Sequence, residues 1–197
     1  GFVDPKGALK HIQALTNGVS RRAAIQKALL PAMLAWLAET PDPEAGLLAF
    51  RKISEGLGET HWYLRKLRDE GEGAEQLATV LGSSRYVTDL ILRAPDSVAL
   101  LGDDAELRPR SLDRLRSEMD LAAERYSDPQ DAIRAVRRVR RRELSRVGIA
   151  DVLGRLDIIE VGEALTDIST ATLSGALKVA IAAVEADRGP MPTRMAI

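Results

Sequence analysis

The residues best suited to chemistry in this sequence are the arginines between positions 131 and 146. This segment holds seven arginines and two acidic residues, a local excess of five positive charges. Each guanidinium group offers a planar set of N–H donors that matches carboxylates and phosphates. In a helix, the apolar residues of this segment take one face, and four arginines project from the other: Arg137, Arg138, Arg141 and Arg142. The pattern predicts that these four arginines form a partner surface for an anionic group.

A second interpretation of the same run stays open. Charge runs on helices are usually solvated faces that acidic residues of neighbouring helices balance. Nucleic acid is the partner that we expect least, because the formal net charge of the chain is −1 and no aromatic residue interleaves with the arginines. The surface is therefore either a contact for another protein or a solvated helix face.

Catalytic and metal-binding patterns are missing from the sequence. There is no phosphate-binding glycine loop, no nucleophile elbow and no cysteine, and the two histidines, His11 and His61, lack a metal-binding partner at helical spacing. We therefore predict no catalytic residue, no cofactor-binding residue and no metal ligand in this chain. The densest aromatic cluster, at residues 60–63, predicts either a core anchor or a ring-stacking pocket, and the core anchor is favoured.

The elements that would position these residues are helices. Alanine, leucine, arginine and glutamate dominate the composition, while runs of β-branched residues are scarce. The Asp-Pro pairs at 4–5 and 42–43 predict helix starts, and Pro31 predicts a kinked or split helix. We expect an all-α fold, an irregular multi-helix bundle of about nine to eleven helices with no sheet. Its last helix, over residues 157–186, has apolar residues on several faces, which predicts neighbours on several sides.

A polar, proline-bearing stretch after residue 102 indicates a weak boundary between two halves of the chain. This predicts a short-helix half at 1–102, a long-helix half at 103–187, and a linker or the start of a next domain at 188–197. No apolar run approaches the roughly 20 residues that a membrane span needs, and no leader sequence is visible. We therefore expect cytoplasmic localisation, no membrane partner, and a segment cut from a longer protein.

Several stretches together resemble one family, the bifunctional glutamine synthetase adenylyltransferases of actinobacterial type. These enzymes attach AMP to a tyrosine of glutamine synthetase and also remove it by phosphorolysis. The resemblance covers essentially the whole chain and rests on four stretches that occur in order: 1–9 (GFVDPKGAL), 29–31 (LLP), 41–48 (PDPEAGLL) and 137–143 (RRVRRRE). Two further stretches, 20–24 (SRRAA) and 60–64 (THWYL), indicate the actinobacterial branch. None of them is a catalytic motif.

The resemblance implies a place within a larger transferase. Members of the family carry two nucleotidyltransferase domains, which use Mg²⁺ and ATP, joined by a helical region that this chain resembles. The glycine-rich turn and paired acids of the second domain would begin after residue 197, so no catalytic residue is carried over. The implied function is a non-catalytic connector in the regulation of nitrogen metabolism. It would position the flanking nucleotidyltransferase domains and contact glutamine synthetase or the PII protein.

The alternative is a purely structural helical bundle or adaptor with no enzymatic parent. Under either hypothesis we expect the segment itself to be inactive, because its side chains are those of packed helices.

Overall fold

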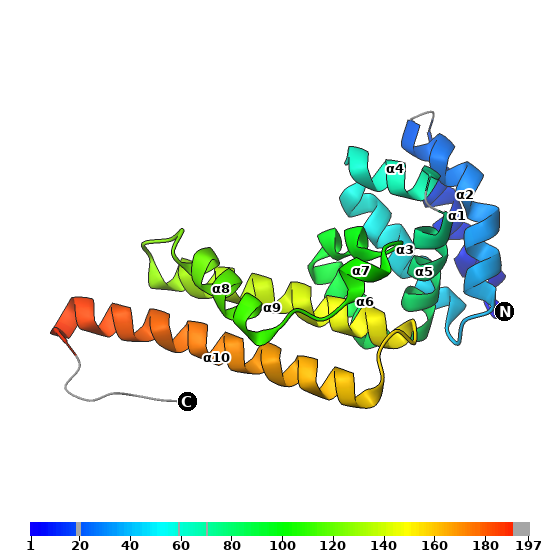
Figure 1. Ribbon diagram of the computed structural model, residues 1–197. Helices are drawn as coiled ribbons and strands as arrows, with labels where there is room; N and C mark the ends of the chain where they lie inside the picture. The colour runs from blue at the N-terminus through cyan, green and yellow to red at the C-terminus, as the bar shows by residue number, and fades with distance from the viewer. Residues whose placement is uncertain (19–20, 59, 70, 191–197) are drawn as a thin grey trace. The chain divides into compact units, whose positions relative to one another are not determined.

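The computed structural model describes residues 1–18, 21–58, 60–69 and 71–190 (Figure 1). These ranges form ten α-helices and one 3₁₀ helix, η1, without a strand, which confirms the all-α fold class. The elements are α1 (Pro5–Thr16), α2 (Arg21–Ala38), α3 (Pro43–Leu57), α4 (His61–Asp69), α5 (Gly71–Ser83), α6 (Arg85–Arg93), η1 (Pro95–Leu100), α7 (Asp104–Leu107), α8 (Leu112–Ala123), α9 (Pro129–Val152) and α10 (Ile158–Arg188).

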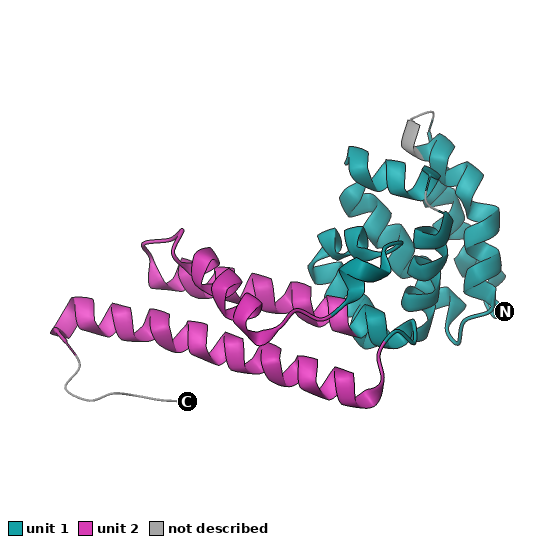
Figure 2. Cartoon of the chain, viewed as in Figure 1, with its two compact units in different colours: residues 1–108, 148–155 teal, residues 109–147, 156–197 magenta. Residues whose placement is uncertain are grey.

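The chain groups into two compact units (Figure 2). Unit 1 contains residues 1–108 and 148–155, and unit 2 contains residues 109–147 and 156–197. Helix α9 belongs to unit 2 up to Val147 and to unit 1 from Gly148 onward. The domain division predicted at residues 102 and 187 stays a prediction. Of the predicted linker, residues 191–197 lie outside the described residues.

The Asp-Pro pairs start helices in unit 1, as the sequence predicts. The carboxylate of Asp4 accepts a hydrogen bond from the Gly7 backbone N–H at 3.0 Å, and that of Asp42 accepts one from the Ala45 N–H at 3.1 Å. In both helices proline holds the first position, where the missing N–H costs no intrahelical hydrogen bond. The carboxylate of Asp42 also accepts a hydrogen bond from Arg85 at 2.9 Å, which links the start of α3 to α6.

Helix α2 continues through Pro31, so of the two predicted outcomes the split is excluded and the kink stays a prediction. Proline removes one backbone donor and crowds the preceding turn, at a cost of roughly 3 kcal/mol. Pro31 itself is exposed, whereas Leu30, Met33 and Leu37 on the other side of the helix are buried. Burial of these side chains offsets the lost hydrogen bond, because each fully buried side chain of this size contributes roughly 1.5–3 kcal/mol.

The aromatic cluster at the start of α4 provides a core anchor. Tyr63 is fully buried, its hydroxyl lies 2.7 Å from the Ser54 hydroxyl, and its ring meets Trp62 edge to face at 6.0 Å between ring centres. Burial raises the pKa of the Tyr63 phenol, although the hydrogen bond with Ser54 partly opposes the shift. The cluster thus packs α4 into unit 1.

Helices α3 and α5 meet at two glycines. A Cβ atom added to Gly46 would lie 2.5 Å from Leu37 Cδ2 and 3.1 Å from the Gly82 Cα. The same crossing carries a backbone hydrogen bond of 2.9 Å from the Asp42 N–H to the Gly82 carbonyl. The glycines are needed for close approach of the two backbones rather than for an unusual backbone conformation.

Unit 2 is built from α8, the first part of α9 and α10. Its core combines small and branched side chains of the three helices: Leu115, Met119, Ala123, Ala132, Val136, Val139, Val147, Ala164, Ile168 and Ala171. Helix α10 begins with a capping box, in which Asp157 accepts from the Glu160 N–H and Glu160 accepts from the Asp157 N–H.

Only one face of α10 is buried within unit 2. The buried positions Ala164, Ile168, Ala171 and Gly175 follow helical spacing, while Ile158 is 83% exposed and Leu173 is 53% exposed. The expectation of neighbours on several sides is therefore wrong for unit 2.

By length and composition α10 passes as a membrane span, with a mean hydropathy of 1.3 over its most apolar window. Core helices of globular proteins pass the same test, so the absence of a membrane partner stays a prediction.

The crossing of α3 and α5 predicts a stability difference between two glycines of the same helix. Gly46→Ala should lower the free energy of unfolding by about 2 kcal/mol, because the added methyl group meets Leu37 and the Gly82 backbone. Gly56→Ala is the matched control, since nothing lies within 4 Å of its added Cβ, and it should stabilise the protein by up to about 1 kcal/mol. Urea denaturation measures both, and equal effects would contradict the close approach.

His11 predicts a pH dependence of stability. Burial and the nearby Arg51 lower the pKa of His11, and Glu55 opposes the shift only in part. The unfolded chain then binds a proton more readily than the folded one, so stability falls as the pH drops below about 6.5. His11→Gln and Arg51→Gln should each flatten the decline in the free energy of unfolding between about pH 7 and pH 5.5. Unchanged slopes in both variants would refute this assignment.

Candidate partner surface

Helix α9 arranges the four predicted arginines in two rows. Residues four apart lie on the same side of a helix, so Arg137 and Arg141 form one row and Arg138 and Arg142 form the next. Arg137 and Arg138 are exposed, whereas Arg141 and Arg142 are half-buried. The opposite side of the helix carries buried apolar residues of the unit 2 core. The predicted outward face is therefore present, but its members differ in exposure.

Arg142 belongs to a charge network that reaches the neighbouring helix. Its guanidinium contacts Glu118 of α8 and lies 3.1 Å from one oxygen of Glu143, whose other oxygen lies 2.9 Å from Arg146 Nε. Glu143 and Arg146 are almost completely buried, with side-chain exposures of 1% and 2%. Burial lowers the pKa of Arg142, but its contacts with Glu118 and Glu143 outweigh this effect and raise the pKa overall.

The remaining arginines of the run fall into two groups. Arg134 pairs with Asp131 of its own helix at 2.6 Å. In the part of the chain that the structure describes, Arg137, Arg138, Arg140 and Arg141 form no ion pair. Acids of unit 2 thus balance some of the charge run, as one interpretation expects, while the other arginines remain available. Whether these bind a partner stays a prediction.

A groove of about 260 Å³ lies between α8 and α9. It brings together one row of the predicted surface, Arg138 and Arg142, with Arg125 at the end of α8. The other lining residues are Glu118, Leu121, Ala122, Tyr126, Ala135 and Val139, and neither Arg137 nor Arg141 is among them. Sequence reasoning missed Arg125 because it lies outside the charge run. It follows the end of α8 at Ala123, and only the pairing of α8 with α9 brings it beside Arg138 and Arg142.

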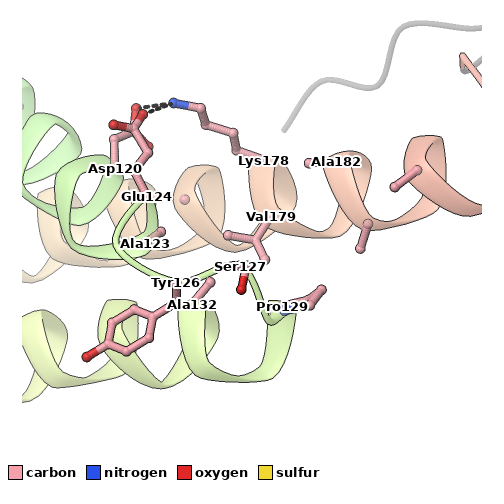
Figure 3. Close-up of a pocket in the computed structure, with 13 residues that line it drawn as sticks. Asp120, Ala123, Glu124, Tyr126, Ser127, Pro129, Ala132, Lys178, Val179 and Ala182 are labelled. Atoms are coloured by element: carbon pink, nitrogen blue, oxygen red, sulfur yellow. Dashed lines mark hydrogen bonds and ion pairs between the residues drawn. The ribbon is translucent and has the colours of Figure 1, made fainter.

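A second cavity, of about 420 Å³, lies where α8, the start of α9 and α10 meet (Figure 3). Small apolar residues line most of it, including Ala123, Ala132 and Val179. At its edge the Lys178 ammonium lies 2.8 Å from Asp120 and 3.5 Å from Glu124. The hydrogen bond with Asp120 raises the pKa of Lys178. Because these charges pair with one another, the cavity offers mainly apolar contacts.

Neither histidine lines the groove or the second cavity. His11 is half-buried in α1, and His61 begins α4 at an exposed position. Among the described residues, no group of three or more histidine, aspartate or glutamate side chains lies close enough to hold a metal ion. The sequence-based expectation that this chain has no metal ligand or catalytic residue stays a prediction.

Comparison with known proteins places the chain in a family. The family model for glutamate-ammonia ligase adenylyltransferase matches residues 74–196.

The chain belongs to the glutamate-ammonia ligase adenylyltransferase family.

Curated relatives agree with this assignment. Over 94% of the present chain, the sequence is 51% identical to a Cutibacterium acnes protein. Over the whole of the present chain, it is 46% identical to a Streptomyces coelicolor protein. A Nocardia farcinica protein is 45% identical, again over the whole chain. Each of these relatives is named a bifunctional glutamine synthetase adenylyltransferase/adenylyl-removing enzyme. The chain spans about a fifth of their length, between 19% and 21%.

The family assignment confirms the resemblance read from the sequence and excludes an adaptor unrelated to adenylyltransferases.

The buried charge pair predicts a specific stability pattern. Arg146→Met should lower the free energy of unfolding by about 3 kcal/mol, because Glu143 loses a charge partner inside unit 2. The double variant Glu143→Met/Arg146→Met should recover most of this loss, since neither buried charge remains. Arg140→Met, at an exposed position of the same helix, is the control and should change stability by less than about 0.5 kcal/mol. Denaturant titration would refute the pattern if Arg146→Met were as mild as the control.

Proposed function

We propose that this chain is a non-catalytic connector and regulatory segment of a cytoplasmic enzyme that adenylylates and deadenylylates glutamine synthetase. It positions two flanking nucleotidyltransferase domains and contacts glutamine synthetase or the PII protein through Arg137, Arg138 and Arg141. The proposal is carried by these three arginines, which lie on the outer side of α9 and have no acidic partner among the described residues. Glutamine synthetase appears in the names of the relatives, while PII follows from the sequence resemblance alone.

The positioning role is supported by α10. This helix has 31 residues, which corresponds to a rigid length of about 46 Å. It exposes several large apolar side chains: Ile158, Ile159, Leu165, Leu173 and Val184. Extended apolar surface of this kind is typical of protein contacts. A long helix with one packed face and one exposed apolar face suits a connector that holds another domain at a fixed distance.

The nucleotide and Mg²⁺ chemistry of the parent enzyme is assigned to the flanking domains. The residues described here do not fit these groups, because no three potential metal ligands lie together and the sequence has no phosphate-binding glycine loop. The connector therefore acts on catalysis only through the arrangement it favours or through what binds it.

The test uses the full-length enzyme that carries this segment. Arg137→Glu/Arg138→Glu/Arg141→Glu should weaken binding to glutamine synthetase or PII by about tenfold or more, because an attraction becomes a repulsion at three positions. Arg142 is left unchanged, since its reversal would disturb the network with Glu118 and Glu143. Surface plasmon resonance at low and moderate salt measures the change, and the effect should shrink as salt screens the charges.

The matched control for this test is Arg116→Glu. Arg116 is exposed on α8 and lies outside the groove, so its reversal should have little effect on binding. If the triple variant bound both glutamine synthetase and PII with unchanged affinity, and its adenylylation rates responded normally to effectors, the partner contact would be ruled out.

A further inference from the structure

The groove between α8 and α9 has an unequal charge balance. Three guanidinium groups line it, those of Arg125, Arg138 and Arg142, against the single carboxylate of Glu118. Glu118 and Arg142 pair with each other. In the described part of the chain, neither Arg125 nor Arg138 has an ion-pair partner. The groove therefore presents two uncompensated guanidinium groups, one from the turn that follows α8 and one from α9.

An apolar surface lies beside these charges. Leu121 is 59% exposed and Tyr126 is 40% exposed, and both line the groove. Ala122, Ala135 and Val139 complete its apolar lining. An exposed leucine and tyrosine next to arginines form a combination that protein interfaces favour, since aromatic and arginine residues contribute much of the binding energy at contacts between proteins.

The size of the groove favours a protein side chain over a small molecule. Its volume of about 260 Å³ is below the roughly 300–1,000 Å³ of typical ligand pockets. Nucleic acid fits less well, because Tyr126 is the single aromatic residue in the groove and stacking sites for successive bases need more. Carboxylates match arginines in geometry and charge, and a bulky aliphatic group matches the apolar floor.

We infer that the groove between α8 and α9 binds an acidic protein segment that carries a bulky apolar side chain. Arg125 and Arg138 bind the carboxylates of this segment, while Leu121, Tyr126 and Val139 cover its apolar side chain. The inference rests on the proposed partner contact of α9 and refines it. It names the chemistry of the partner segment, adds Arg125 to the surface, and assigns the apolar side chain of the partner to the groove.

The first experiment measures fluorescence anisotropy with the whole 197-residue chain and a labelled peptide of glutamates around a central leucine. Arg125→Glu/Arg138→Glu should weaken binding by about tenfold or more, because both groove charges reverse. Arg137→Glu/Arg141→Glu changes the net charge by the same amount outside the groove, and we expect it to weaken binding by less than about threefold. Thermal melts followed by circular dichroism check that both variants fold.

Two further peptides separate the charged from the apolar contribution. Replacing the glutamates with glutamines should abolish measurable binding. Replacing the leucine with serine should weaken binding by about fivefold, since the transfer of several methylene groups out of water is lost.

Several outcomes would overturn the inference. The chain could fail to bind the glutamate–leucine peptide, or the two double variants could weaken its binding equally. Binding could also be unchanged when the leucine is replaced, or a single-stranded oligonucleotide could bind more tightly than the peptide. Each can occur while the proposed function survives, because that function is judged by binding of glutamine synthetase or PII to the full-length triple variant. If instead the triple variant binds both partners normally while the peptide results hold, the proposed function fails and the groove remains a site for acidic segments.

Discussion

Unit 2 depends on the burial of one carboxylate, that of Glu143. A carboxylate removed from water is costly unless cations and hydrogen bonds replace the lost hydration. Arg142 and Arg146 supply this compensation from the positions one before and three after Glu143 on the same helix. Arg142 also reaches Glu118, so the local compensation extends to α8. The single acid at the centre of the arginine run therefore has two arginine partners, and one of them, Arg142, also links α9 to α8 through Glu118.

The small residues of α10 are the second requirement for this arrangement. Gly175 lies at ordinary van der Waals distance from two helices, because a Cβ built on it would be 3.6 Å from Met119 and 3.7 Å from Val136. Ala164 and Ala171 are buried on the same face. These small side chains let α10 lie close to both α8 and α9. The large apolar residues of α10, such as Ile158 and Leu173, lie elsewhere on the helix and are exposed. The result is a helix with apolar residues on more than one face that is packed on one side within its unit.

Features set by neighbouring residues could be predicted from the sequence, and features set by tertiary contacts could not. The starts at Asp4-Pro5 and Asp42-Pro43 depend on hydrogen bonds across three residues, so their chemistry is visible locally. Whether Pro31 splits its helix could not be read from the sequence, because the burial of Leu30, Met33 and Leu37 depends on other helices. The pairing of Arg142 depends on Glu118, which is 24 positions away along the chain. Arg125 joins the site only through helix pairing.

The arginines around the groove differ in whether acids of the chain already pair with them, and this difference explains how the groove can add selectivity to a partner contact. A carboxylate that meets Arg142 finds a guanidinium already bonded to Glu118 and Glu143, so the contact adds little. Arg125 and Arg138 have no such partners in the described part of the chain, but an exposed ion pair contributes only about 0.2–1 kcal/mol. Two such pairs cannot give firm binding alone. Leu121 and Tyr126 add apolar area that a partner can bury. The groove is selective because a partner must supply carboxylates for the arginines and an apolar side chain for this area.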